Sequence, residues 1–256
     1  MDRRASLAAI ICAAIAACGG ATTGVMLPAD ARVLARGSLA YAARASATAI
    51  VTIELEERFA LVVRDPHSGR ERTRVDLGPA ERDVVALAVS GRLAWVGGDD
   101  RRVRTIDLER GAVVATWPAA ADVTALRWLS GGWLAIGDAS GVVCLRRVAD
   151  GALVQCAALT ATPIATLEGG GGLSVAASDG RTTWTVPALA ATTPVPARRW
   201  RGHLVSVAGR EVRAGHRLVA RLGERVRSVE VGPRGELIVA AWVAGLDDPS
   251  VIVLPR

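Results

Sequence analysis

The sequence contains no lysine and no asparagine, and its 256 residues include one phenylalanine and one tyrosine. All 31 basic residues are therefore arginines, and their formal excess over the acidic residues is only six. Proteins that bind single-stranded nucleic acid need a basic groove and aromatic side chains on which bases stack. Because the arginines are scattered and aromatic platforms are few, we predict no nucleic-acid partner.

Recognisable catalytic and metal-binding motifs are also missing. The sequence has no GxSxG, HExxH, P-loop or dinucleotide-binding pattern. Its three histidines, His67, His203 and His216, are far apart and have no serine or cysteine partner in a known arrangement. No CxxC pair or Cys/His cluster occurs. We therefore predict no cofactor, no metal and no enzymatic activity.

The N-terminus has a short basic start followed by an uncharged apolar run over residues 5–17. A membrane-spanning helix needs roughly 20 apolar residues, so this run has the length of a signal peptide instead. It ends in IAACG at residues 15–19, which resembles the lipobox of bacterial lipoproteins. The resemblance implies cleavage before Cys18 and lipidation of that cysteine. An ordinary signal peptide that contains a cysteine by chance is the alternative.

The expected organisation is a signal peptide at 1–17, a flexible tether at 18–30 and one domain at 31–256. Small and flexible residues at 19–24 favour the tether. The residue after the cysteine is Gly19 rather than aspartate. By the same resemblance, the protein is expected in the cell envelope, at the outer membrane if the source is Gram-negative.

The domain contains a repeat of about forty residues, each copy made of four short β-type segments separated by turn residues. The segment at 83–89 aligns with that at 122–128, 39 residues later. The next two segments repeat in the same way, at 92–99 and 133–138 and then at 103–108 and 142–147. Turns at 109–111 and 149–151 precede the fourth segments. Four strands per forty residues predict the blade of a β-propeller.

Two stretches resemble WD repeats. Residues 177–184 (ASDGRTTW) and 226–241 (VRSVEVGPRGELIVAA) are similar to two conserved parts of that repeat. The resemblance is degenerate, because no blade ends in Trp-Asp and Gly202-His203 lacks its usual spacing. We therefore expect the blades to pack mainly through apolar side chains and not through the polar network of regular WD repeats.

The fold class predicted is all-β, a single β-propeller of about six four-stranded blades, with five or seven also possible. The units fall near 38–79, 80–119, 120–159, 160–199, 200–222 and 223–256. The last unit ends at its third strand, so we expect residues 31–36 at the N-terminus to supply its fourth strand and close the blade.

Cys144 and Cys156 flank the turn at 149–151 and are expected to lie opposite each other on a hairpin. An oxidising compartment allows a disulfide between them. Direct cross-strand pairing often strains disulfide geometry. The sequence therefore leaves two alternatives, a disulfide bridge or two buried thiols.

Two groups of residues are candidate binding sites. Aspartates fall between the second and third strands of several blades and could form an acidic rim, although turn formation explains such aspartates equally well. These are Asp99, Asp100, Asp138, Asp179, Asp247 and Asp248. Trp200 is expected to be exposed on a connector beside Arg198, Arg199 and Arg201, a combination typical of protein-binding hot spots. A solvated connector is the alternative.

The function expected from these features is that of a membrane-tethered scaffold, monomeric by itself, which binds another protein. An exported propeller hydrolase or lactonase, or a propeller that binds a small ligand in its central channel, is the alternative.

Overall fold

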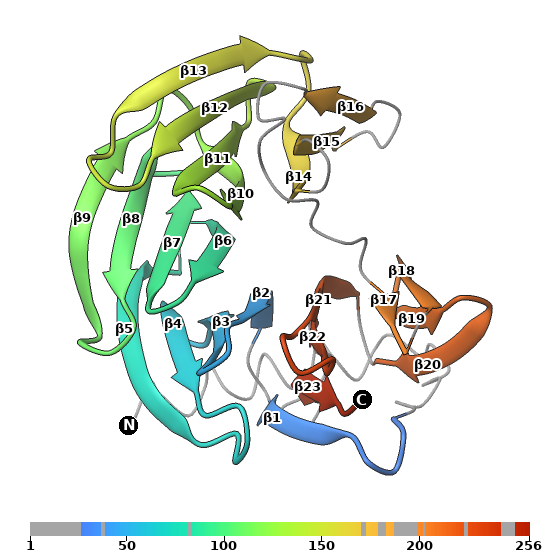
Figure 1. The fold of residues 1–256 in the computed structure, drawn as a ribbon. Helices are drawn as coiled ribbons and strands as arrows, with labels where there is room; N and C mark the ends of the chain where they lie inside the picture. The colour runs from blue at the N-terminus through green and yellow to red at the C-terminus, as the bar shows by residue number, and fades with distance from the viewer. Residues whose placement is uncertain are drawn as a thin grey trace, which may run out of the picture.

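The computed structural model describes residues 27–36, 39–80, 83–169, 173–178, 183–186, 199–201, 203–222, 225–241 and 249–256. Within these ranges the regular elements are all β-strands, numbered β1 to β23, and they form six antiparallel sheets. Figure 1 shows the sheets arranged around a common centre, as the blades of a propeller are. The prediction of an all-β propeller with about six blades is confirmed.

Each sheet contains consecutive strands, apart from the sixth. The first contains β2 (Leu39–Ala45), β3 (Ile50–Leu55), β4 (Arg58–Arg64) and β5 (Glu71–Pro79). The second contains β6 (Val84–Ser90), β7 (Leu93–Gly98), β8 (Arg102–Asp107) and β9 (Ala112–Pro118). The third contains β10 (Val123–Leu129), β11 (Trp133–Asp138), β12 (Val142–Arg147) and β13 (Leu153–Ala158).

The other three sheets are shorter or composite. The fourth contains β14 (Ile164–Gly169), β15 (Leu173–Ala177) and β16 (Thr183–Val186). The fifth contains β17 (Arg199–Trp200), β18 (His203–Ala208), β19 (Glu211–Ala214) and β20 (Arg217–Arg221). The sixth contains β21 (Val226–Val231), β22 (Leu237–Ala241), β23 (Pro249–Leu254) and β1 (Arg32–Arg36).

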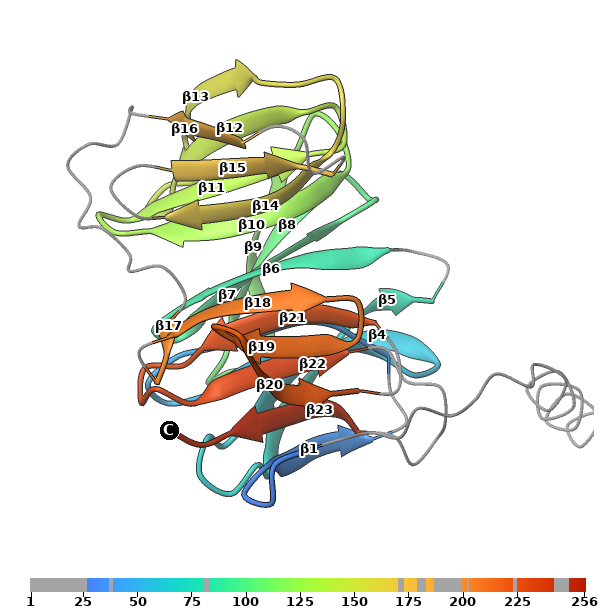
Figure 2. The same cartoon turned by 90° about the vertical axis from the view of Figure 1, so that its right-hand side faces the viewer.

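Strand β1 comes from the N-terminus and completes the sixth sheet beside β23, as predicted (Figure 2). It runs antiparallel to β23, with Arg32 opposite Val253 and Val33 opposite Ile252. Without β1, the backbone groups of β23 on that side would be left unpaired at the edge of the sheet.

The segment before β1 differs from expectation. We expected a free tether up to residue 30, but Leu27 packs against the apolar cluster of the fifth and sixth sheets. Asp30 forms an ion pair with Arg201, at 3.7 Å. The packed domain therefore begins at or before Leu27, because an apolar side chain gains more by covering this cluster than by staying in water.

The core lies between neighbouring sheets. Five apolar clusters join the first sheet to the second, the second to the third, the third to the fourth, the fifth to the sixth and the sixth to the first. Among the described residues, no such cluster joins the fourth sheet to the fifth. Figure 1 shows these two sheets apart, so the ring of described sheets is open at this place.

Glycines allow neighbouring blades to approach closely. The position of a Cβ on Gly97 of β7 would be 2.5 Å from Val123 of β10. Forty residues later, the same position on Gly137 of β11 would be 2.6 Å from Ile164 of β14. The apolar packing expected between blades is thus present, and in two places it depends on the absence of a side chain opposite a β-branched residue.

A buried ion pair lies in the first sheet. Arg64 donates hydrogen bonds to Thr52 Oγ1 at 2.9 Å and to both carboxylate oxygens of Glu54. Strand alternation puts these side chains on the face of Ile50, which packs against the sixth sheet. Loss of one partner would leave a buried unpaired charge, at a cost of about 3–5 kcal/mol.

Deleting β1 should destabilise the propeller. A chain beginning at Ser38 loses the pairing with β23 and the partial burial of Val33 and Leu34, together worth about 3 kcal/mol or more. We expect its melting temperature to fall by roughly 6–12 °C relative to a chain beginning at Gly19. A chain beginning at Met26 keeps Leu27 and should melt like the longer form. Melting is monitored by circular dichroism. Equal melting temperatures for all three chains would contradict this role of β1.

Adding one methyl group at Gly137 should also destabilise the fold. Gly137→Ala is expected to lower the free energy of unfolding by about 1–3 kcal/mol, because the new Cβ overlaps Ile164. In a protein that already carries Ile164→Ala, Gly137→Ala should lower the free energy of unfolding much less. Denaturant unfolding of the two single variants and the double variant should therefore give a coupling energy of about 0.5–3 kcal/mol. Additive effects of the two substitutions would show that the close approach carries no strain.

Candidate functional site

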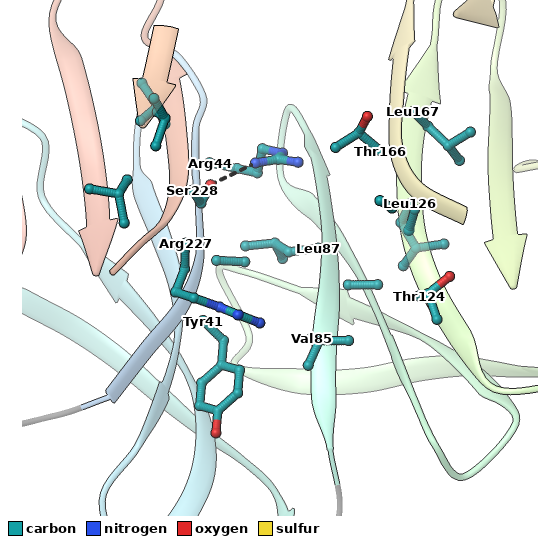
Figure 3. Close-up of a pocket in the computed structure, with 17 residues that line it drawn as sticks. Tyr41, Arg44, Val85, Leu87, Thr124, Leu126, Thr166, Leu167, Arg227 and Ser228 are labelled. Carbon is teal, nitrogen blue, oxygen red and sulfur yellow. Dashed lines mark hydrogen bonds between the residues drawn. The ribbon is translucent and has the colours of Figure 1, made fainter. Parts of the chain in front are cut away.

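Residues of all six sheets line a central cavity of about 240 Å³. Each sheet contributes a strand near the centre: β2, β6, β10, β14, β18 and β21. These strands are rich in small and β-branched residues, which fit a sheet covered on both faces. Much of the wall is therefore apolar, and Figure 3 shows Val85, Leu87 and Leu126 beside the open space.

Two arginines from adjacent strands reach into this cavity (Figure 3). Arg44 of β2 donates hydrogen bonds to the Ala43 carbonyl at 2.9 Å and to Ser228 Oγ at 3.2 Å. Its guanidinium also lies 3.9 Å from the Glu230 carboxylate. Arg44 thus joins the inner strands of the first and sixth sheets.

Arg227 of β21 has a different environment. Its guanidinium lies 5.8 Å from the centre of the Tyr41 ring. Burial lowers the pKa of Arg227, and the nearby positive charge of Arg225 lowers it further, while Tyr41 and Asp83 act in the opposite direction. Burial likewise raises the pKa of Tyr41, so at neutral pH the phenol is uncharged. Arg44 and Arg227 are thus the charged residues in the lining, with the carboxylates of Glu230 and Asp83 near them.

A second feature is an apolar stretch on the outside of the ring. Val113 and Val114 of β9 and Leu153 and Val154 of β13 are large apolar side chains with 45–54% of their surface exposed. They occupy matching positions, two and three residues after the hairpin glycines at 111 and 151. We call these four residues the outer-edge surface. Both strands form the outer margin of their sheets (Figure 1).

The outer-edge surface lies on strands without a single charged residue, AVVATWP in β9 and LVQCAA in β13. The marginal strands β1, β5 and β20 each carry at least two arginines. Charged side chains protect a sheet edge from pairing with other chains. The edges of the second and third sheets lack this protection, and so does the sequence of β16 (TWTV) at the margin of the fourth sheet.

A disulfide and two hydrogen bonds connect the uncharged edge strands to neighbouring strands. Cys144 of β12 and Cys156 of β13 lie directly opposite each other, as the spacing predicts, and form a disulfide. Of the two states left open by the sequence, the structure thus has the bridge. Arg146 donates hydrogen bonds to the Pro118 carbonyl of β9, at 2.8 Å, and to the Gly151 carbonyl, at 2.7 Å. The disulfide links β13 to β12 in its own sheet. Arg146 of β12 links the turn before β13 to the end of β9.

No protein-family model and no curated protein matches the chain by sequence. Solved structures match it well. The RRP9 WD40 repeats share 13% identity at a TM-score of 0.64, covering 91% of this chain and 99% of that one. The WD40 propeller domain of Doa1 shares 13% identity at a TM-score of 0.58, covering 91% and 98%. A chain of the Mitotic Checkpoint Complex, also 13% identical, gives a TM-score of 0.55 over 86% and 76%.

The fold is that of a WD40 β-propeller. At these identities the likeness shows the fold alone. It agrees with the WD-repeat resemblance found at residues 177–184 and 226–241.

The aspartates of the candidate acidic rim whose contacts are described act within or next to their own turns. Asp138 accepts hydrogen bonds from the backbone of Ser140 and Val142, at 2.9 and 3.0 Å. Asp100 accepts from Arg102 N and pairs with Arg104. Asp99 lies in the same turn as Asp100.

The turn interpretation therefore accounts for the two aspartates whose contacts are known, Asp100 and Asp138. Asp179, Asp247 and Asp248 lie outside the described residues. Nowhere in the part of the chain that the structure describes do three acidic, histidine or cysteine side chains gather as metal ligands would.

Trp200 is not the exposed anchor that we expected. It belongs to β17, is only 4% exposed and packs in the cluster of the fifth and sixth sheets. The Arg201 guanidinium covers its ring at 4.3 Å. A large aromatic surface gains more from this burial than from exposure on a connector. Arg198 and the side chain of Arg199 lie outside the described part.

Sequence reasoning missed both features of this propeller. The uncharged composition of β9 and β13 was visible, but their position at the sheet margin follows from the strand order. Arg44 and Arg227 belong to separate repeats, 183 positions apart, and only ring closure brings them into one cavity.

Proposed function

We propose that this protein is a membrane-tethered scaffold that binds another protein through the outer-edge surface. The observation that carries the proposal is that β9 and β13 are uncharged and expose large apolar side chains, whereas the margin strands β1, β5 and β20 carry arginines. An exposed, uncharged edge strand is an aggregation site unless something covers it. A partner segment bound along β13 or β9 would cover it.

Two further observations support this proposal. WD40 propellers are a fold suited to protein interaction, and one similar chain comes from the Mitotic Checkpoint Complex, an assembly. The disulfide links β13 to β12, and Arg146 links the end of β9 to the turn before β13. A surface already in its bound shape loses less conformational entropy when a partner binds.

The tether forms the second part of the proposal. Cys18 lies outside the described residues, and the nine positions from Cys18 to Leu27 allow a reach of at most about 30 Å. Figure 1 shows β13 across the ring from β1. A lipid on Cys18 would therefore leave the outer-edge surface directed away from the membrane and open to a partner. Among the described residues, no helix has the length and apolar character needed to cross a membrane.

An arginine in the outer-edge surface should weaken partner binding. A photoreactive amino acid at Gln155, which is exposed on β13, should cross-link one protein reproducibly in detergent-solubilised membranes. Val154→Arg should weaken that complex by about 2 kcal/mol or more, roughly thirtyfold, because a charge would be buried without a partner. The matched control is Ala208→Arg, which adds the same charge to an exposed position on β18.

The scaffold proposal fails if Val154→Arg leaves the complex intact while Ala208→Arg removes it. It also fails if no partner is cross-linked and the purified protein turns over a metabolite. A divalent metal requirement for that turnover would favour the hydrolase alternative.

Cys18→Ala should release the protein from the membrane fraction. The substitution removes the thiol that receives the acyl chain, so incorporation of an alkyne-labelled fatty acid should stop. Cys12→Ala is the matched control and should keep both the label and the membrane location, because Cys12 lies in the expected signal peptide. Label in the Cys18→Ala protein, or none in the unaltered protein, would rule out the lipid anchor.

A further inference from the structure

The two strands of the outer-edge surface differ in their free backbone groups. Among the described strands, β13 has β12 as its one neighbour in the third sheet, so one side of its backbone faces outward. In an antiparallel pair, opposite residues alternate between pairs that exchange both backbone hydrogen bonds and pairs that exchange none. The residues of a non-bonded pair direct their N–H and C=O groups away from each other. The separation of the two strands at the disulfide shows which residues of β13 do so.

Cys144 and Cys156 form a non-bonded pair. Their Cα atoms are 4.1 Å apart, close to the roughly 4.5 Å of such pairs and well below the roughly 5.5 Å of bonded ones. The hairpin agrees, because Arg147, three positions after Cys144, donates its N–H to the Ala152 carbonyl at 2.9 Å. Cys156 and, two positions later, Ala158 therefore direct their N–H and C=O groups outward. Both residues are exposed.

The equivalent edge of β9 is already protected. Pro118 of β9 corresponds to Ala158 of β13, since each lies opposite the first residue of the preceding strand. Pro118 has no N–H, and its carbonyl already accepts a hydrogen bond from Arg146 at 2.8 Å. A proline blocks the pairing of an edge strand with another chain. Because β13 has an alanine at this position, it is the strand of the outer-edge surface that is open to a further strand.

We propose that the partner adds a strand to the third sheet, by placing an extended, uncharged segment along β13. The outward groups of Cys156 and Ala158 would form about four backbone hydrogen bonds with that segment, as in other complexes made by strand addition. β13 (LVQCAA) has no charged residue that could match a charge on the segment, and a charge buried without a match is costly. Leu153 and Val154, both exposed, add an apolar contact at the start of the strand. This inference rests on the proposed function, because it specifies how the partner engages the same surface.

The experiment uses as its probe a six-residue peptide of alternating threonine and valine, acetylated and amidated at its ends. N-methylation of every second residue blocks one edge of this peptide, so that it cannot stack into sheets and offers its other edge to β13. In NMR spectra of the protein, the amide signals of Cys156 and Ala158 should shift saturably with the peptide and exchange more slowly with solvent. A control peptide that is N-methylated on both edges should cause neither change.

A matched pair of variants tests the backbone of each edge strand. Ala158→Pro should weaken peptide binding by about tenfold, because it removes an outward N–H and places a ring at the edge. The equivalent position of the second sheet already holds a proline, so we expect the fold and its melting temperature to be retained. Pro118→Ala on β9 is the control and should change the affinity by less than about twofold. If Ala158→Pro lowers the melting temperature, the two peptides still test the proposal on the unaltered protein.

Three results would overturn strand addition. They are the absence of saturable shifts at Cys156 and Ala158, equal binding of the peptide blocked on both edges, and equal peptide binding by a folded Ala158→Pro protein. The scaffold proposal is tested separately, by the effect of Val154→Arg on the cross-linked complex. If Val154→Arg weakens that complex while no peptide binds to β13, the partner is held by side chains alone, and only strand addition is wrong.

Discussion

The contact between the sixth and first sheets holds the ring together. The described sheets form an open series from the fourth, through the third, second, first and sixth, to the fifth. The joint between the sixth and first sheets therefore connects the last two sheets to the other four. β1 completes the sixth sheet, and Arg32 in β1 donates a hydrogen bond to the Pro66 carbonyl of the first sheet at 2.9 Å. Ser228 Oγ bonds to the Ala43 carbonyl in the same joint, at 3.3 Å.

Packing between the other sheets follows a different principle. Regular WD repeats use a polar network that this sequence lacks, and here the blades meet through aliphatic side chains and close glycine contacts. Gly97 against Val123 and Gly137 against Ile164 are equivalent contacts in successive repeats. Such contacts are not directional, so they tolerate degenerate repeats as long as volume and shape are conserved. This explains how blades with so little WD signature still form the fold.

The two candidate sites depend on opposite parts of the same blades. Inner strands are covered on both faces and leave a small central cavity, in which Arg44 and Arg227 provide positive charge. Outer strands form the margins of the sheets, and those of the first, fifth and sixth sheets carry arginines. Those of the second and third sheets do not, and the disulfide between Cys144 and Cys156 stabilises one of them. The uncharged margins and the arginine-lined centre therefore lie on different strands of the blades.

The sequence by itself determined the local features: strand spacing, the forty-residue repeat, the hairpin that brings Cys144 opposite Cys156, and the need for residues 31–36 to complete the last blade. These follow from turn residues and from the period of two along a strand, which act over short distances. Only the tertiary structure decided which residues meet across repeats. It buried Trp200, which we had expected to be exposed, and it brought Arg44 and Arg227 into one cavity. Burial and long-range proximity depend on how the sheets pack around the ring, and no local pattern encodes that packing.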